Sequence, residues 1–148
     1  MRKYGLILLL FAIAACKTSQ QNWQNDLVAY KEIKDKTMEL ELMRAPGNDT
    51  TVLNYKIRIF PAKAWLENMP PNSAFNFSYK MDSCFFIRAG NLMQLPLFTQ
   101  PVANGVKNCF EYLVSFQADA GIKMKWLQLI YVDKYINGKT YSFELNKQ

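Results

Sequence analysis

The chain has 148 residues, of which 18 are basic and 12 acidic, and it contains no histidine. This length is enough for one domain with a hydrophobic core, and the lack of histidine removes the commonest general base and metal ligand. The positive charges are spread along the chain without forming a basic run, so we expect no nucleic-acid partner.

The first sixteen residues place a basic start before an apolar run, small residues and a cysteine. Arg2 and Lys3 precede the apolar residues 5–12, a run shorter than the roughly 20 residues that cross a bilayer. The next four residues are Ile13-Ala14-Ala15-Cys16. This order resembles the signal peptide and lipobox of bacterial lipoproteins. The alternatives are an uncleaved anchor helix and an ordinary signal peptide with a chance cysteine.

The resemblance implies that residues 1–15 are a removed signal peptide and that Cys16 carries a covalent lipid anchor. Residues 16–26 then form the lipidated cysteine and a polar tether to the domain. Lys17 follows the cysteine, which favours the outer membrane under the enteric sorting rule. The periplasmic and the surface face of that membrane both stay open. We expect no cofactor other than the lipid on Cys16.

From residue 27 onward, apolar and polar residues alternate with a period of two, which is typical of half-buried β-strands. The clearest predicted strands are 38–42, 55–59, 75–81, 110–116 and 140–146, and less regular ones cover 27–34, 84–88 and 92–99. Residues 126–135 are apolar on both faces at their start, which predicts a central strand. Only residues 62–69 are predicted to be helical.

The spacing of these strands predicts an all-β fold in residues 27–148, an antiparallel β-sandwich of immunoglobulin-like or transthyretin-like kind. Asn137-Gly138 predicts a two-residue type I′ turn before the last strand. A small closed β-barrel is the alternative architecture, because eight strands can close around a ligand.

Cys84 and Cys109 remain once Cys16 is assigned to the lipid. An even pair in an exported domain predicts a disulfide, which would close a loop of about 25 residues. Two free buried thiols are the alternative. We expect no catalytic thiol without a histidine base, and no motif has metal-ligand spacing, so no metal site is predicted.

Two further segments are candidate functional sites. Asp49-Thr50-Thr51 resembles the short motif of some bacterial periplasmic O-glycosylation systems, which makes Thr50 a candidate for modification. Residues 95–106 are apolar but interrupted by two prolines and a glycine. They either fold over one open end of the sandwich or form a partner-binding loop, whose candidate residues are Leu97, Phe98, Pro101, Val102 and Asn104.

The sequence favours a non-enzymatic accessory lipoprotein that touches the membrane through its acylated cysteine and binds another envelope protein. The alternative is a lipoprotein that binds an apolar molecule or a sugar in a barrel-like or inter-sheet pocket. An enzyme is the third class, although the carboxylates are dispersed and no local pair of them is suggested. A ligand binder predicts an enclosed pocket, whereas a partner-binding module predicts a filled core and an exposed apolar patch. The oligomeric state is left open.

Overall fold

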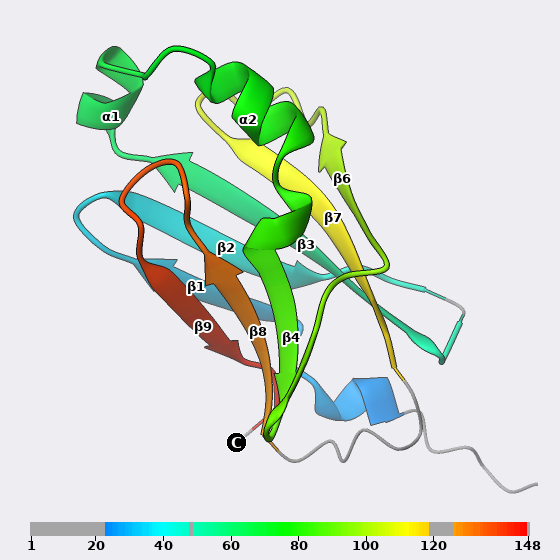
Figure 1. Ribbon diagram of the computed structural model, residues 1–148. Helices are drawn as coiled ribbons and strands as arrows, with labels where there is room; N and C mark the ends of the chain where they lie inside the picture. Colours follow the sequence, from blue (N-terminus) through cyan, green and yellow to red (C-terminus); the bar gives the residue numbers. More distant parts are fainter. Residues whose placement is uncertain (1–22, 48, 119–125, 148) are drawn as a thin grey trace, which may run out of the picture.

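Two antiparallel β-sheets pack face to face around one core (Figure 1). The computed structural model describes residues 23–47, 49–118 and 126–147. The larger sheet has the strand order β1-β2-β3-β7-β6. Its strands are β1 (Tyr30–Lys34), β2 (Met38–Arg44), β3 (Val52–Pro61), β6 (Phe98–Val102) and β7 (Phe110–Gln117). The smaller sheet has the order β5-β4-β8-β9, formed by β4 (Phe85–Ala89), β5 (Leu92–Gln94), β8 (Leu127–Val132) and β9 (Thr140–Glu144).

The alternation read from the sequence determines which side chains enter the core. In β3 every second residue is buried, from Leu53 to Ile59, and the residues between them face outward. The prediction of an antiparallel β-sandwich is therefore confirmed. The alternative of a closed barrel is wrong, because the strands form two separate sheets whose outer strands do not pair with each other.

Aromatic rings fill the space between the two sheets. Phe85 of β4 contacts Tyr112 of β7 with ring centroids 5.6 Å apart, and it stacks on Tyr131 of β8 at 5.3 Å. All three side chains are fully buried. Such rings bury a large apolar area and interact favourably with each other, so this cluster holds the two sheets at a fixed separation.

Two short helices cover one end of the sandwich (Figure 1). They are α1 (Lys63–Glu67) and α2 (Ser73–Tyr79), followed by the 3-10 turn η2 (Asp82–Cys84). The helix predicted within residues 62–69 is confirmed. The strand predicted for residues 75–81 is wrong, since most of this range belongs to α2.

The error has a physical cause in the spacing of the apolar residues. A period-two pattern also places similar residues four apart, and residues four apart share one face of a helix. In α2 the buried residues are Ser73 and Phe77, whereas Phe75 and Tyr79 form an exposed pair with centroids 5.2 Å apart. A seven-residue segment with this pattern fits a helix as well as a strand.

Phe77 attaches α2 to the core. Its ring stacks on Phe110 with centroids 4.1 Å apart and meets the edge of Trp65 at 5.8 Å. The Tyr112 hydroxyl donates a 2.6 Å hydrogen bond to the Phe77 carbonyl oxygen, and burial raises the pKa of Tyr112 further above its usual value. The helices therefore cover this end of the sandwich, whereas residues 98–102, within the segment that was one candidate for covering an open end, form the outer strand β6.

The 3-10 turn η1 (Trp23–Asp26), with which the described part of the chain begins, lies at the opposite end of the sandwich (Figure 1). Leu27 forms an isolated antiparallel bridge with Asn146, and the Lys147 N–H donates to the Asp26 carbonyl oxygen at 3.1 Å. The Leu127 N–H in turn donates to the Asn146 side chain at 2.7 Å. These contacts place the chain entry beside the start of β8.

The connection between β8 and β9 is longer than the predicted two-residue turn. Type I′ geometry requires positive φ at both central residues, but of the pair Asn137-Gly138 only Gly138 has a positive φ, of 71°. The buried Asp133 carboxylate organises the loop instead. It accepts the Tyr131 hydroxyl and the backbone N–H groups of four loop residues, Tyr135, Ile136, Asn137 and Gly138.

Replacing Asp133 by alanine should leave these backbone donors without an acceptor inside the fold. We expect Asp133→Ala to lower the free energy of unfolding by at least about 2 kcal/mol, measured by urea denaturation with circular dichroism. Asp82→Ala is the matched control because Asp82 is exposed, and it should stay close to the wild type. Equal losses in the two variants would contradict the role assigned to Asp133.

Candidate functional site

One side of the sandwich is bordered by strands without charge. β5 and β6 are the outer strands of the two sheets on this side, and residues 95–97 join them directly. The chain from residue 89 to residue 106 has no charged side chain. The outer strands on the other side differ, since β1 contains Lys31, Glu32 and Lys34, and β9 contains Glu144. Charged side chains protect outer strands from unwanted pairing, so the β5–β6 side is the less protected one.

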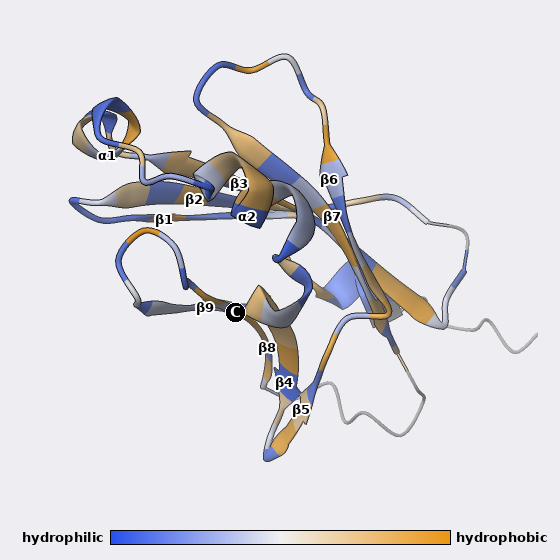
Figure 2. Cartoon of the chain, turned by 45° about the horizontal axis from the view of Figure 1, so that its top comes forward, coloured by the Kyte–Doolittle hydropathy of each residue, from blue (hydrophilic) through white to orange (hydrophobic). Residues whose placement is uncertain are grey.

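Large apolar side chains project to solvent on this side. Leu95 is 60 % exposed, Leu97 55 % and Phe98 47 %, and we call these three residues the apolar edge. Figure 2 shows that the apolar colouring continues in β5, where Leu92 and Met93 are also half exposed. Contiguous exposed apolar residues on a soluble domain are typical of interaction sites.

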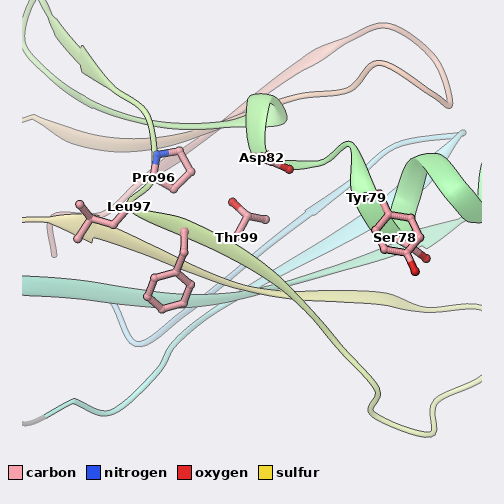
Figure 3. A pocket seen from close by; sticks show the side chains of 7 residues that line it. Ser78, Tyr79, Asp82, Pro96, Leu97 and Thr99 are labelled. Carbon is pink, nitrogen blue, oxygen red and sulfur yellow. The ribbon is translucent and has the colours of Figure 1, made fainter.

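A pocket of about 480 Å³ lies beside the apolar edge. Figure 3 shows Thr99 between Pro96 and Leu97 on one side and Ser78 and Tyr79 of α2 on the other. The lining residues of the pocket are Ser78, Tyr79, Asp82, Pro96, Leu97, Phe98 and Thr99. The pocket therefore combines ring faces, hydroxyl groups and one carboxylate, and it opens to solvent at exposed residues such as Tyr79 and Leu97.

Two buried oxygen atoms of this region have no hydrogen-bond partner among the described residues. They are Thr99 Oγ1, on a wall of the pocket, and Gln94 Oε1 at the end of β5. A buried polar atom without a partner costs about 1–3 kcal/mol. A bound group that donates hydrogen bonds here would remove that cost.

The structure brings some of the predicted partner-binding residues together and separates others. Leu97 and Phe98 lie at the pocket, whereas Pro101 and Val102 lie further along β6, which is an edge strand rather than a loop. Proline is tolerated there because an edge strand leaves one side unpaired. Asn104 serves a structural contact, since its side-chain N–H₂ donates to Glu111 Oε2 at 2.8 Å.

Sequence reasoning missed the half of the pocket that α2 and η2 supply. Ser78 and Tyr79 were assigned to a strand, and Asp82 was treated as a dispersed carboxylate. Pro-Pro-Asn at residues 70–72 directly before Ser73 is a signal for a helix start that could have indicated α2. Nothing local indicates that α2 meets β6, because their contact is long-range.

Glu111 is the centre of a charged cluster on the outer face of the larger sheet. Its carboxylate accepts from the Arg58 guanidinium at 2.6 Å and from Asn104, and Lys56 Nζ lies 3.8 Å away. Burial alone would raise the pKa of Glu111, but the hydrogen bonds from Asn104 and Arg58 outweigh it, and the pKa is lowered. The cluster holds the segment between β6 and β7 against the sheet.

A second polar cluster connects the two hairpin ends near the helices. Asp35 accepts from Thr37, from Lys139 Nζ at 2.9 Å and from the Tyr141 hydroxyl at 2.8 Å. The pKa of Asp35 is strongly lowered. The hydrogen bond from Thr37 is the largest cause, and the hydrogen bond from Lys139 is the second. Because Asp35 follows β1 and Tyr141 belongs to β9, this cluster joins the larger sheet to the smaller one.

Within the described ranges, no group of three or more cysteine and carboxylate side chains could hold a metal ion. A search of the same residues for a helix long and apolar enough to cross a membrane also finds none. The carboxylates of Asp35, Glu111 and Asp133 all join parts of the fold to each other.

Cys84 and Cys109 are free thiols, so the predicted disulfide is not formed in the structure. Each thiol has its own neighbours: Cys84 donates weakly to the Lys80 carbonyl oxygen, and Cys109 accepts from Asn104 at 3.4 Å. Burial raises the pKa of Cys84 to about 11, and burial also raises the pKa of Cys109. Neither thiol therefore has the lowered pKa that marks a nucleophilic cysteine.

The remaining candidate residues stay predictions. Cys16 lies outside the described residues. Thr50 lies in the turn between β2 and β3 and is exposed, and its modification is untested.

The lowered pKa of Glu111 predicts how stability depends on pH. A carboxyl group whose pKa is lower in the folded than in the unfolded state, where it is about 4.3, stabilises fully above that value. The contribution is lost as the pH falls through the folded pKa. We expect Glu111→Gln to lower the free energy of unfolding by about 1–3 kcal/mol at neutral pH.

The difference between this variant and the wild type should shrink below about pH 4, as measured by urea titrations across the acid range. Glu67→Gln is the control, because Glu67 is exposed in a surface ion pair with Lys63 and should change little. A difference that persists at low pH would show that Glu111 acts through packing instead of charge.

The state of the two cysteines can be checked by thiol labelling. Cys84 is buried and Cys109 is partly exposed, so we expect an alkylating reagent at mildly alkaline pH to modify Cys109 slowly and Cys84 only after denaturation. Mass spectrometry of the digested protein reads each site separately from Cys16, and Cys109→Ser should leave the native domain from residue 23 onward unlabelled. Two unreactive cysteines, with a mass lower by two hydrogen atoms, would instead support the disulfide.

No protein-family model matches the chain, and comparisons with curated proteins and with solved structures find no match.

Proposed function

We propose that this chain is a lipoprotein of the outer membrane whose β-sandwich binds another envelope protein and catalyses no reaction. The order of residues 1–16 supports the anchor, since it resembles a signal peptide with a lipobox ending at Cys16. Two or more acyl chains hold a protein stably at a membrane. A domain that stays at one membrane meets its partner by lateral encounter.

The apolar edge is the observation that carries the binding role. Leu95, Leu97 and Phe98 are exposed and lie close together in the sequence. The segment that contains them, residues 89–106, has no charged residue, although one-fifth of all residues in the chain are charged. Burying such side chains is worth roughly 25 cal/mol per Å² of apolar area removed from water. The edge therefore offers a partner a favourable contact that the fold itself leaves unused.

The pocket supplies the polar part of this binding site. Thr99 Oγ1 and Gln94 Oε1 lack partners in the described part of the chain, and the outer side of β6 is open to a further strand. An extended segment that joins an edge strand binds through its main chain and gains specificity from side-chain pockets. A partner segment lying along β6 could thus donate to these oxygen atoms.

A sugar ligand is the second candidate, and the chemistry of the pocket favours it. Tyr79, Phe98 and Pro96 supply ring faces, and Asp82 supplies a carboxylate that can accept from sugar hydroxyls. The volume of about 480 Å³ lies in the usual range for small ligands. The open shape is less typical, because ligand sites bury most of the ligand.

The test is co-purification of the acylated full chain from detergent-solubilised membranes, with mass spectrometry of residue 16 to verify the anchor. We expect a partner protein in constant ratio to the wild type, and its loss in Leu97→Lys, because a buried unpaired charge opposes docking. Tyr30→Lys is the matched control, since Tyr30 is also half exposed but lies on the charged strand β1.

Equal recovery with both variants would contradict docking at the apolar edge. Recovery of acylated wild type alone, at full yield, would contradict partner binding itself. Sugar binding by the isolated protein that is lost in Thr99→Val would support the second candidate instead.

A further inference from the structure

We infer that the end of the sandwich opposite the helices lies against the membrane and that Trp126 enters the head-group region of the bilayer. This inference rests on the proposed lipid anchor at Cys16. It adds an orientation of the domain and a second contact with lipid, neither of which follows from acylation alone.

The contacts of η1 place the tether beside Trp126. Asp26 and Leu27 pair with residues 146 and 147 at the C-terminal end of the chain. The Asn146 side chain accepts from the N–H of Leu127, the residue next to Trp126. Asn146 therefore contacts both Leu27, where the chain enters the domain, and Leu127, the residue next to Trp126.

The same end exposes three large apolar side chains. Trp126 is 76 % exposed, and Leu92 and Met93 are half exposed. The strand register brings them together, because Ala89 pairs with both Leu127 and Leu92. Trp126 and the β4–β5 turn thus lie at the same corner of the smaller sheet. Figure 1 shows η1 and this turn at the end far from α1 and α2.

The length of the tether keeps this corner close to the lipid. Cys16 and Trp23 are seven positions apart, and an extended chain spans at most about 3.6 Å per position, or about 25 Å in total. A coil-like chain of this length has a root-mean-square span of roughly 15 Å. The first part of the domain to meet the bilayer is then the part that carries η1.

Trp126 has the chemistry of an interfacial residue. Tryptophan is enriched at membrane–water interfaces, where its ring lies at head-group depth. Its backbone φ of 70° is a left-handed conformation that bulky residues rarely adopt and that costs free energy. A large ring at such a position is mostly exposed and gains little from the described part of the fold, and insertion into the head-group region would bury it.

The test uses the acylated chain in phosphatidylethanolamine–phosphatidylglycerol vesicles, with and without brominated acyl chains, which quench tryptophan by contact. All samples carry Trp23→Phe, because Trp23 lies in η1 at the same end as Trp126 and would add its own signal. We expect a blue-shifted emission with strong quenching, and loss of most of this quenched signal when Trp126→Phe is added. Trp65→Phe is the matched control, because Trp65 lies in α1 at the far end, and it should keep the quenched signal. Circular dichroism verifies that each variant is folded.

A second arm separates this inference from the proposed anchor. In this arm, the Cys16→Ser variant is attached to nickel-chelating lipid through an N-terminal hexahistidine tag. The lipid binds only the tag, because the chain has no histidine. Quenching of Trp126 in this arm supports the orientation even if residue 16 of the native protein is not acylated. Stable vesicle attachment in either arm without quenching of Trp126, or with equal quenching in Trp65→Phe and Trp126→Phe samples, overturns it.

Discussion

The fold depends on two contacts of Tyr112, one with the opposite sheet and one with α2. Its ring packs against Phe85 of the opposite sheet, and its hydroxyl holds the Phe77 carbonyl oxygen of α2. The first contact sets the separation of the sheets, and the second fixes α2 over one end. α2 and η2 form one wall of the pocket, and β6, which pairs with β7, forms the other. Tyr112 of β7 therefore helps to position both walls.

The polar groups of the fold fall into two kinds. Asp133, Asp35 and Glu111 have full sets of partners and tie loops or sheets together. Thr99 Oγ1 and Gln94 Oε1 are buried without a partner in the described part of the chain. Native proteins satisfy nearly all buried polar atoms, so the second kind is unusual. Both of its members lie in the same uncharged segment as the apolar edge, which is why that side is the candidate site.

The sequence was sufficient for the fold class and for most strands, because alternation over five or more residues is a local signal. β2 and β3 follow it closely. It failed for α2, where a seven-residue pattern fits two periods, and for Asn137-Gly138, where the Asp133 carboxylate takes the N–H groups of the loop. Leu97 and Phe98 were predicted as partner-binding residues, and the structure places both at the pocket. Their neighbours Tyr79 and Asp82 were not predicted, since the pocket joins segments that are distant in sequence and is set by tertiary packing.

The bridge between Leu27 and Asn146 would bear force in the proposed anchored protein. It lies where β1 leaves η1 and where β9 ends, and thus fastens the outer strands of the two sheets to each other at the point of attachment. In the proposed anchored protein, a force on the N-terminal segment would act first on this bridge and on the hydrogen bonds from the Val28 N–H to the Leu145 carbonyl oxygen and from the Lys147 N–H to the Asp26 carbonyl oxygen. Because these contacts join the beginning of the domain to its end, such a force would have to break them before it could peel β1 from the sandwich.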